Sequence, residues 1–503
     1  MIFGKSALFC KFVLKKALIY VIISITFSES GTVAISTLNT FFQNLDHTGV
    51  FMSSNRGSFS GKIGFVLAAA GSAVGLGNIW RFPYLAAKYG GGIFLLVYVA
   101  LSVTFGFSLM VAEIAIGRKS QVSAIGAFGA LNKRFSFLGI MASVVPIIIL
   151  PYYSVIGGWV MKYLAGFTVG QASEMAQSDY FGNYIGSVGE PLLWFAMFMA
   201  ITAVIVLFGV EKGIEKVSKV MMPVLVVLIL GIAIYTICTM DGAWEGVAYY
   251  ILPDFSNFSI MTVVAAMGQL FYSMSLAMGI MITFGSYMKK DISIAKSATQ
   301  IEIFDTGIAF LAGLMIIPAV FAFSGGDESA LGQGPGLMFV TLPKVFDSMP
   351  GGTIIGTAFF FMVFLAALTS AISLMETIVA MFIDKLNVNR KISCLIVLGI
   401  CVLIGIPSSL GYSLWSEVTV LGMQLLDFFD FASNSLLMPI VALITCIFAG
   451  YVLKPKTLVE EIELSGKFKQ KAMFSVVIRY VAPVCILLIL ASSVLSAFGV
   501  ISI

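Results

Sequence analysis

Apolar stretches of roughly helix length, separated by short polar segments, follow one another from Lys62 to the end of the chain. A helix needs about 20 apolar residues to cross the ~30 Å hydrocarbon layer of a bilayer. A membrane β-barrel would instead show short segments of alternating polarity. The pattern predicts an all-α integral membrane protein with about eleven spans. These spans are expected at 62–85, 91–118, 137–168, 191–209, 216–239, 261–286, 294–324, 352–384, 391–412, 418–450 and 474–501.

The polar segments between the predicted spans alternate in charge. Every second segment is basic, with Arg118, Lys119, Lys133, Arg134, Lys212, Lys216, Lys219, Lys289, Lys290, Lys385, Arg390, Lys391, Lys454, Lys456, Lys467, Lys469 and Lys471. The others are acidic or neutral, with Lys344 as the main exception. Because basic loops stay in the cytoplasm, we expect the first span to start inside and the C-terminus to lie outside. The chain is thus predicted to be a multi-pass protein of a bacterial inner membrane.

Residues 1–51 do not fit this pattern. A short apolar run at 17–27 follows Lys15 and Lys16, and a polar stretch comes after it. The run is too short to span a membrane comfortably and resembles a signal-like segment, or an upstream translation start ahead of Met52. We therefore treat 1–51 as an N-terminal extension and 52–503 as the transmembrane domain.

Composition supports the membrane prediction and excludes other classes. The 503 residues are 59% hydrophobic and 11% charged, whereas soluble domains hold roughly 25% charged residues. The net charge of +4 is spread over short loops, so no nucleic-acid partner is indicated. The spans group no histidines, cysteines or paired carboxylates, so we expect neither catalytic residues nor an enzymatic cofactor.

The first span is interrupted by glycines at 71, 75 and 77, followed by Asn78 and Arg81. Each interior glycine costs a helix ~1 kcal/mol relative to alanine, so this stretch unwinds easily. Unwound backbone inside a membrane must line a cavity or bind something, and its free carbonyl oxygens suit a small cation. Close helix packing is the alternative, because Gly71 and Gly75 also fit a small-xxx-small contact. Arg81 favours function, because a charge within a span is expensive.

The sixth span carries a second, weaker interruption at 268–279, where small and hydroxyl residues concentrate. Interrupted helices at matching places in two halves of a chain are typical of inverted-repeat transporters with a binding site near the membrane midplane.

Four motifs, at 71–83, 112–118, 268–279 and 368–370, resemble the neurotransmitter:sodium symporter family, in particular its bacterial, leucine-transporter-like members with eleven helices. The resemblance runs from Arg56 to the last span. It implies a 5+5 inverted repeat with interrupted helices one and six, repeat one at about 62–239, repeat two at about 261–450 and an extra helix at 474–501. The implied function is sodium-coupled symport of an amino acid into the cell by alternating access. Many members have twelve helices, so a homodimer contact through a final helix is left open.

The resemblance assigns site residues by motif position. A first sodium ion, shared with the substrate carboxylate, is expected at Ala73, Asn78, Ser273 and Asp305. A second is expected at Gly71, Val74, Ala366, Thr369 and Ser370. The substrate is expected at Ala73, Leu76, Gly77, Ile149, Tyr153, Ile156, Tyr272, Ser275, Met278 and Leu374. The outer gate is expected at Arg81, Gln269, Tyr272 and Asp430, with Asp427 as a second choice, and the inner gate at Arg56, Phe59, Tyr287 and Asp384.

Departures from the family pattern sharpen the prediction. Asp305 replaces the usual asparagine and would supply permanently the negative charge that chloride brings in other members, so transport is expected to be independent of chloride. No charged residue matches a pocket position, which favours a neutral, hydrophobic amino acid. Met278 suits a larger side chain while Ala277, in place of a glycine, narrows the same region, so aliphatic and aromatic substrates both stay open.

Three alternatives accompany these assignments. An ion channel or an amino-acid-sensing receptor could use the same scaffold. Each gate pair could also be an ordinary surface ion pair, worth at most ~1 kcal/mol.

Glu113, within the second span, is expected to hydrogen-bond the unwound sixth helix rather than to relay protons.

Overall fold

The structure is a computed structural model that describes residues 57–325 and 335–497. The predictions for residues 1–51 and for Arg56 lie outside the described residues. Within those ranges the regular elements are helices, and the extended pairings are two isolated bridges, Gly91 with Pro253 and Val420 with Met423. The predicted all-α class is confirmed.

Nine helical segments of the described chain are long and apolar enough to cross a membrane. They are Gly92–Ser120 (α5, Gly92–Leu101; η2, Ser102–Gly106; α6, Phe107–Ser120), Lys133–Thr168 (η3, Lys133–Phe135; α8, Ser136–Thr168), Gly189–Leu207 (α11), Val210–Thr239 (η4, Val210–Glu215; α12, Lys216–Thr239), Ile294–Ser324 (α16), Gly352–Leu386 (α18), Arg390–Leu410 (α19), Leu425–Val452 (α20, Leu425–Asp430; η8, Phe431–Leu437; α21, Met438–Ile447; η9, Phe448–Val452) and Lys471–Ser496 (α23, Lys471–Val476; η10, Val477–Val481; α24, Ala482–Ala497). Each matches a predicted span, and two broken segments complete the set.

The first predicted span is broken as the glycines suggested. α3 (Lys62–Ala73) ends, and after residues 74–76 the chain continues as η1 (Gly77–Arg81) and α4 (Phe82–Lys88) at an angle of 55° to α3. Val74 already has an extended backbone, with ψ of 101°. The break therefore exposes the backbone polar groups of this turn in the middle of the span.

The sixth predicted span is broken as well. α14 (Ile260–Ser273) begins with a capping box formed by Ser259 and Thr262, and α15 (Ile280–Ser286) follows after a non-helical stretch at 274–279. Three residues of this stretch have left-handed backbones, Ser275 at φ 52°, Ala277 at φ 60° and Gly279 at φ 72°. Only glycine adopts this conformation without strain, so the tertiary contacts must hold the other two residues there.

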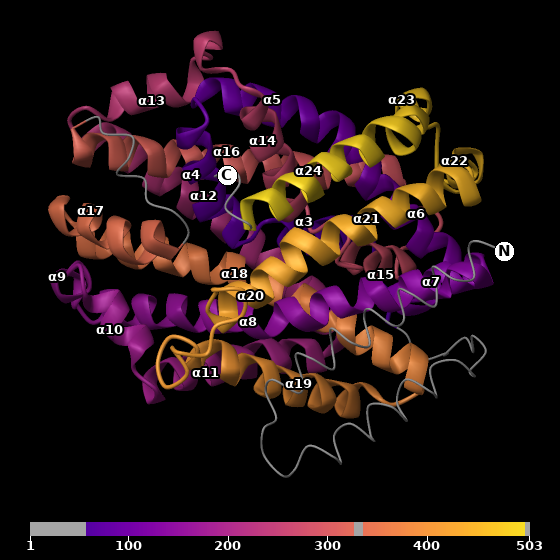
Figure 1. Cartoon of the computed structure of the whole chain (residues 1–503), viewed down its shortest axis with the longest axis horizontal. Coiled ribbons are helices and arrows are strands. Elements are labelled where there is room, and N and C mark those ends of the chain that lie inside the picture. Colours follow the sequence, from indigo (N-terminus) through magenta and orange to yellow (C-terminus); the bar gives the residue numbers. More distant parts are fainter. Residues whose placement is uncertain (1–56, 326–334, 498–503) are drawn as a thin grey trace.

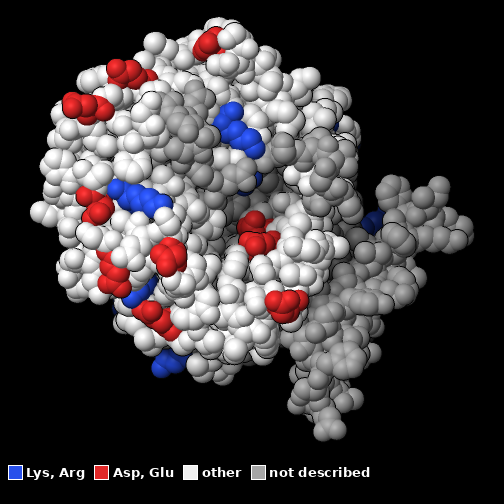
Figure 2. Space-filling view, turned by 60° about the vertical axis from the view of Figure 1, so that its left-hand side comes forward, with Lys and Arg blue, Asp and Glu red and all other residues white. Residues whose placement is uncertain are grey.

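Short helices at the two ends of the bundle were missed by the sequence prediction. α7 (Ala124–Leu131) and α22 (Pro455–Glu463) lie with α15 at one end, called here the basic end. α9 (Ala172–Met175), α10 (Tyr180–Gly186), α13 (Ala243–Ile251) and α17 (Leu342–Ser348) lie at the opposite, acidic end (Figure 1), and η7 (Leu337–Thr341) packs against α17. Figure 2, seen toward the acidic end, shows Asp and Glu side chains spread around a hollow in the surface.

One predicted boundary is wrong by seven residues. The span expected to start at residue 418 starts at Leu425, because residues 418–424 form a turn closed by the bridge between Val420 and Met423. Leu421 and Gly422 have positive φ values of 55° and 77°, which a helix cannot contain. An apolar run alone does not show such a turn.

The broken helices lie inside the bundle, and lipid-facing helices surround them. α3 packs against α12, α16 and α18, α14 packs against α5, and α15 packs against α6. The outward faces of α12, α19 and α24 carry exposed apolar side chains such as Val227, Leu403 and Val484. Apolar side chains on the outside suit a lipid surrounding, and non-helical backbone inside a membrane is tolerated only where protein or a cavity surrounds it. The repeat boundaries at 62–239 and 261–450 stay a prediction.

Candidate functional site

A cavity lies between the two helix breaks and the facing parts of α8 and α18. Fifteen residues line it: Ser72, Ala73, Gly75, Leu76, Gly77, Asn78, Ile149, Tyr153, Tyr272, Ser273, Ser275, Met278, Ile280, Ser370 and Leu374. Nine of the ten residues predicted for the substrate are among them. Ile156, which is buried on α8, is the exception.

Glycine is required where the first break meets its neighbours. A Cβ added to Gly75 would lie 2.8 Å from Ser370 Oγ and 3.2 Å from Tyr153 Oη. A Cβ added to Gly77 would lie 2.6 Å from two ring carbons of Tyr272. The Leu76 N–H donates to Tyr153 Oη at 3.4 Å. Bare backbone thus faces the cavity, with Tyr272 lying over it and a phenolic hydroxyl beside it.

Three of the four residues predicted for the first sodium ion are joined by hydrogen bonds. The Asn78 amide donates to Asp305 Oδ1 at 2.8 Å and to Ser273 Oγ at 2.9 Å, and Ser273 Oγ donates to Asp305 Oδ1 at 2.7 Å. The fourth, Ala73, lines the adjoining cavity. Tyr98 Oη, which sequence reasoning missed, donates to Asp305 Oδ2 at 3.5 Å.

The donor set of this cluster suits an alkali cation. Asp305 is fully buried, and no Lys or Arg of the described chain forms an ion pair with it. Burying an uncompensated carboxylate costs several kcal/mol, which a bound cation offsets. The available ligands are carboxylate, amide and hydroxyl oxygens, and hard cations prefer oxygen. No group of three or more His, Cys, Asp or Glu that could hold a metal ion occurs among the described residues.

The residues predicted for the second sodium ion also converge, between α3 and α18. Ser370 Oγ lies 3.3 Å from the Val74 carbonyl oxygen and 3.5 Å from that of Gly71. Thr369 Oγ1 donates to the Ala366 carbonyl at 3.0 Å. Gly71 also packs closely on Thr369, since an added Cβ would lie 3.2 Å from Thr369 Cβ. Close packing of Gly71 against α18 and a cation site at these oxygens therefore involve the same contact between α3 and α18.

The predicted ion pair of the outer gate is not formed. No nitrogen of Arg81 lies within 4.0 Å of a carboxylate oxygen of Asp430 or Asp427. Arg81 instead lies over the Tyr272 ring, 5.3 Å from its centroid. Asp430 accepts hydrogen bonds from Tyr152 at 3.1 Å and from Asn434 at 2.6 Å.

The carboxylate of Asp430 is thus hydrogen-bonded by Tyr152 and Asn434, two residues that sequence reasoning missed. Asn434 could have been found from the sequence, because it lies four residues after Asp430, one helical turn along the same span. Gln269 Nε2 donates to the Gly77 carbonyl at 2.9 Å, and the role of Gln269 in the outer gate stays a prediction.

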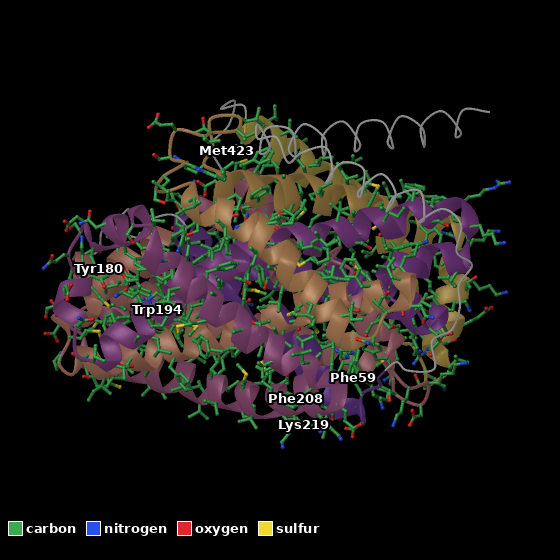
Figure 3. The ribbon with its side chains drawn as sticks, turned by 90° about the horizontal axis from the view of Figure 1, so that it is seen from below. Phe59, Tyr180, Trp194, Phe208, Lys219 and Met423 are labelled. Carbon is green, nitrogen blue, oxygen red and sulfur yellow. The ribbon has the colours of Figure 1, made fainter. Side chains whose placement is uncertain are left out.

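At the basic end, Phe59 and Tyr287 of the predicted inner gate lie together. Phe59 is fully buried, with its ring centroid 5.5 Å from that of Phe284 and 6.2 Å from that of Tyr287. Figure 3 shows Phe59, Phe208 and Lys219 along the lower edge of the view, well away from Tyr180. Asp384 accepts hydrogen bonds from the N–H and the hydroxyl of Ser123, at the start of α7. Its pairing with Arg56 stays a prediction, because Arg56 lies outside the described residues.

A buried acid that was not predicted completes this inner cluster. Tyr287 Oη donates to Glu376 Oε1 at 2.9 Å, and Arg390 pairs with both oxygens of Glu376 at 2.5 and 2.9 Å. Glu376 is fully buried within α18. An acid inside a span was the signal that could have found it.

Glu113 makes the contact expected of it. Its Oε1 accepts the Ala277 N–H at 2.7 Å, in the non-helical stretch between α14 and α15. An amide that an unbroken helix would satisfy internally is satisfied here by a side chain of α6. This bond stabilises the left-handed backbone at Ala277.

Comparisons with known proteins agree with this geometry. The sequence profile of the Sodium:neurotransmitter symporter family matches residues 56–180 and 177–499. An uncharacterized sodium-dependent transporter of Bacillus subtilis, YhdH, is 36% identical over 86% of this chain and 96% of its own length. One from Haemophilus influenzae is 33% identical over 88% of this chain and 99% of its own length. The crystal structure of MhsT in complex with L-phenylalanine is 39% identical and covers 87% of this chain and all of its own, with a TM-score of 0.79.

Proposed function

Because the chain belongs to the sodium:neurotransmitter symporter family, we propose that it carries a neutral, hydrophobic amino acid into the cell together with sodium ions, without chloride. It is a multi-pass membrane protein and a sodium-dependent symporter. The observation that carries the finer proposal is the cavity between the two helix breaks, which has an oxygen cluster for a cation at one side and an apolar wall at the other.

Coupling follows from the position of the sodium cluster beside the substrate cavity. Asn78 and Ser273 belong both to the cluster with Asp305 and to the cavity wall. A substrate carboxylate held near Leu76 and Gly77 would share the first ion with Asp305. Each ligand would then complete the other's site, which is a reciprocal coupling of their affinities.

The cavity wall supports the proposed substrate class. No Lys, Arg, Asp or Glu is among the residues that line it, so a charged substrate side chain would be left unpaired. Ile149, Met278 and Leu374 provide apolar surface. The bound L-phenylalanine of the similar MhsT structure supports a large apolar amino acid. Aromatic and aliphatic substrates are separated by competition against labelled leucine and phenylalanine.

Independence from chloride rests on Asp305. Its carboxylate accepts hydrogen bonds from Asn78, Ser273 and Tyr98, which places a permanent negative charge inside the sodium cluster. Chloride would add a second charge of the same sign to this buried position, which is unfavourable.

Orientation follows from the loop charges. Lys289, Arg390 and Lys454 lie in segments at the basic end, and basic segments stay in the cytoplasm. We therefore assign the basic end to the cytoplasm of the bacterial inner membrane, with the acidic end outside. Protease protection of a tag placed after residue 503 tests this assignment.

The transport proposal is tested in proteoliposomes with an inward sodium gradient and labelled amino acids. We expect accumulation above the external concentration that collapses when the gradient is removed and is unchanged when gluconate replaces chloride. Each net charge moved gains ~2.3 kcal/mol per 100 mV, so an inside-negative potential should speed uptake. Sodium current without accumulation would identify a channel, and binding without uptake would identify a receptor.

A further inference from the structure

Residues 57–60, the segment just before α3, bridge two elements at the basic end. A Cβ added to Gly57 would lie 3.1 Å from Val210 of η4, so the backbone here lies directly against η4. Phe59 inserts its ring against Phe284 and Tyr287, at the end of α15. The segment thus spans from the start of α12 to the loop that follows α15.

Glu215 holds the far side of this bridge. Its carboxylate accepts hydrogen bonds from the Ser60 N–H at 2.8 Å and from the Ser60 hydroxyl. Lys219, one turn along, donates to the same carboxylate at 2.6 Å. Lys289, in the loop after α15, donates to the Ser60 carbonyl at 3.1 Å. Donor and acceptor groups of Ser60 are therefore bound by two different elements.

The carboxylate occupies a space that the sequence leaves for it. A Cβ added to Gly64, in the first turns of α3, would lie 2.1 Å from Glu215 Cδ. Glu215 is the last residue of η4 and comes directly before α12. The residue is nevertheless only 1% exposed. Its position over the start of α3 also places a negative charge near a helix N-terminus, which is favourable.

We propose that Glu215 is a positioning residue of transport, whose bonds with Ser60, called here the Glu215 latch, hold α3 in place while the basic end is closed. The proposal rests on the proposed function, because alternating access requires α3 to leave this position when the basic end opens. Opening then breaks the two bonds from Ser60, which are bonds to a charged acceptor and among the stronger ones in proteins.

The element that carries the latch is suited to release it. Glu215 ends η4, a π-helical turn that follows Gly209 with φ of 85°. Such turns hold their backbone less firmly than an α-helix and recur at functional sites. Gly213 within η4 also has no room for a side chain, since an added Cβ would lie 2.2 Å from the Ile205 carbonyl oxygen. A small rearrangement of η4 would move the carboxylate away from Ser60.

The latch is tested by measuring how far α3 moves. Spin labels are attached at Ile63→Cys on α3 and Leu395→Cys on α19, both exposed positions near the basic end, and pulsed electron resonance gives the distance between them. The background carries serine in place of the accessible or undescribed cysteines, Cys10, Cys238 and Cys485. Glu215→Ala should raise the ratio of long to short distances about tenfold, the loss expected for one charged hydrogen bond.

Two further variants separate a latch from damage to the fold. Gly64→Ala should produce the same shift, because its methyl group displaces the carboxylate, and Gly64→Ala with Glu215→Ala should shift no more than Glu215→Ala alone. Glu215→Gln, which retains one acceptor for Ser60, should lie between Glu215→Ala and the unmutated chain. Glu211→Ala, an exposed acid on the same turn, is the matched control and should leave the ratio unchanged.

Each outcome decides the proposal. An unchanged ratio in Glu215→Ala, or independent and multiplying effects of Gly64→Ala and Glu215→Ala, overturns the latch. The distances are recorded in sodium without substrate, so they do not depend on which amino acid is carried. If the unmutated chain concentrates no amino acid but Glu215→Ala still shifts the ratio, the transport proposal fails and the latch stands. If the unmutated chain concentrates an amino acid but Glu215→Ala does not shift the ratio, the latch fails and the transport proposal stands.

Discussion

Replacing Asp305 by asparagine tests the charge of the sodium cluster with little change in shape. An asparagine can still accept from Asn78 and Ser273 through its carbonyl oxygen. Its NH₂ group would meet Tyr98 Oη, which can accept as well as donate. The substitution therefore removes one negative charge from a fully buried position and keeps most of the hydrogen bonds.

The magnitude follows from Coulomb's law and the cost of burial. A sodium ion about 4 Å from the carboxylate charge gains ~4 kcal/mol at an effective dielectric constant of about 20. Part of this is offset, because the unoccupied carboxylate is itself destabilised by burial. A net loss of about 1.5–3 kcal/mol remains for Asp305→Asn, the range of a hydrogen bond to a charged group, and corresponds to roughly 10- to 150-fold weaker sodium activation.

The assay is uptake of labelled amino acid into proteoliposomes as a function of sodium, with chloride or gluconate as the anion. We expect the unmutated chain to give the same sodium curve in both anions. Asp305→Asn should need more sodium in gluconate and recover part of the loss in chloride, because an anion can now enter beside Asn78, Ser273 and Tyr98. Glu302→Gln, an acid one turn away that bonds Ser102 instead, is the matched control and should change neither curve.

Two results would refute the reasoning about Asp305. Unchanged sodium activation in Asp305→Asn would mean that the carboxylate does not contribute to the ion. Equal chloride dependence of Asp305→Asn and Glu302→Gln would mean that any acid of α16 sets the anion requirement, and that the contacts of Asp305 are irrelevant to it.

Three further predictions concern the cavity. Ala277→Gly, in the second helix break beside the cavity, removes left-handed strain of roughly 1–2 kcal/mol, so it should raise the melting temperature of the purified protein. Gly75→Ala places a methyl group 2.8 Å from Ser370 Oγ, and it should abolish sodium-dependent uptake while the protein still purifies as a monodisperse particle. Tyr272→Phe keeps the ring beneath Arg81 and should retain most uptake, whereas Tyr272→Ala should raise KM at least tenfold in the same assay; equal effects of the two would show that the ring is not the lid.

The sequence predicted the spans well because the physical signal is strong and local. A stretch of about 20 apolar residues has few alternatives to a membrane helix. The first break was also predictable, since three glycines weaken one helix at adjacent turns. The short helices α7, α10 and α17 could not be predicted. They pack on the ends of the bundle, and they hold too few apolar residues to show a helical repeat. The turn before Leu425 escaped for a similar reason, since its apolar residues look like a continuation of the span.

The second break shows what a sequence pattern cannot contain. Ser275 and Ala277 have left-handed backbones that their residue types disfavour. The bond from the Ala277 N–H to Glu113, 164 residues earlier in the chain, supplies the missing stabilisation. Glu113 was expected to make such a bond only through the resemblance to a family, and not through any property of its own segment. Tertiary contact decides the local conformation here.

The two ends of the molecule differ in the contacts that the predicted gate residues make. At the basic end the segment before α3 and the predicted gate residues are held by several contacts: Phe59 is buried among aromatic rings, Ser60 is bound by Glu215 and Lys289, and Tyr287 is bound to Glu376. At the acidic end the predicted pair of Arg81 and Asp430 is not made.

Alternating access requires that the two gates are not open at the same time. If the basic end is closed, the Arg81–Asp430 ion pair at the acidic end can be open. The partners of Asp430 support this reading, because Tyr152 and Asn434 satisfy its carboxylate while Arg81 rests on Tyr272. Pairing of Arg81 with Asp430 would then belong to a later step, in which the substrate is enclosed from the acidic end before the Glu215 latch releases α3.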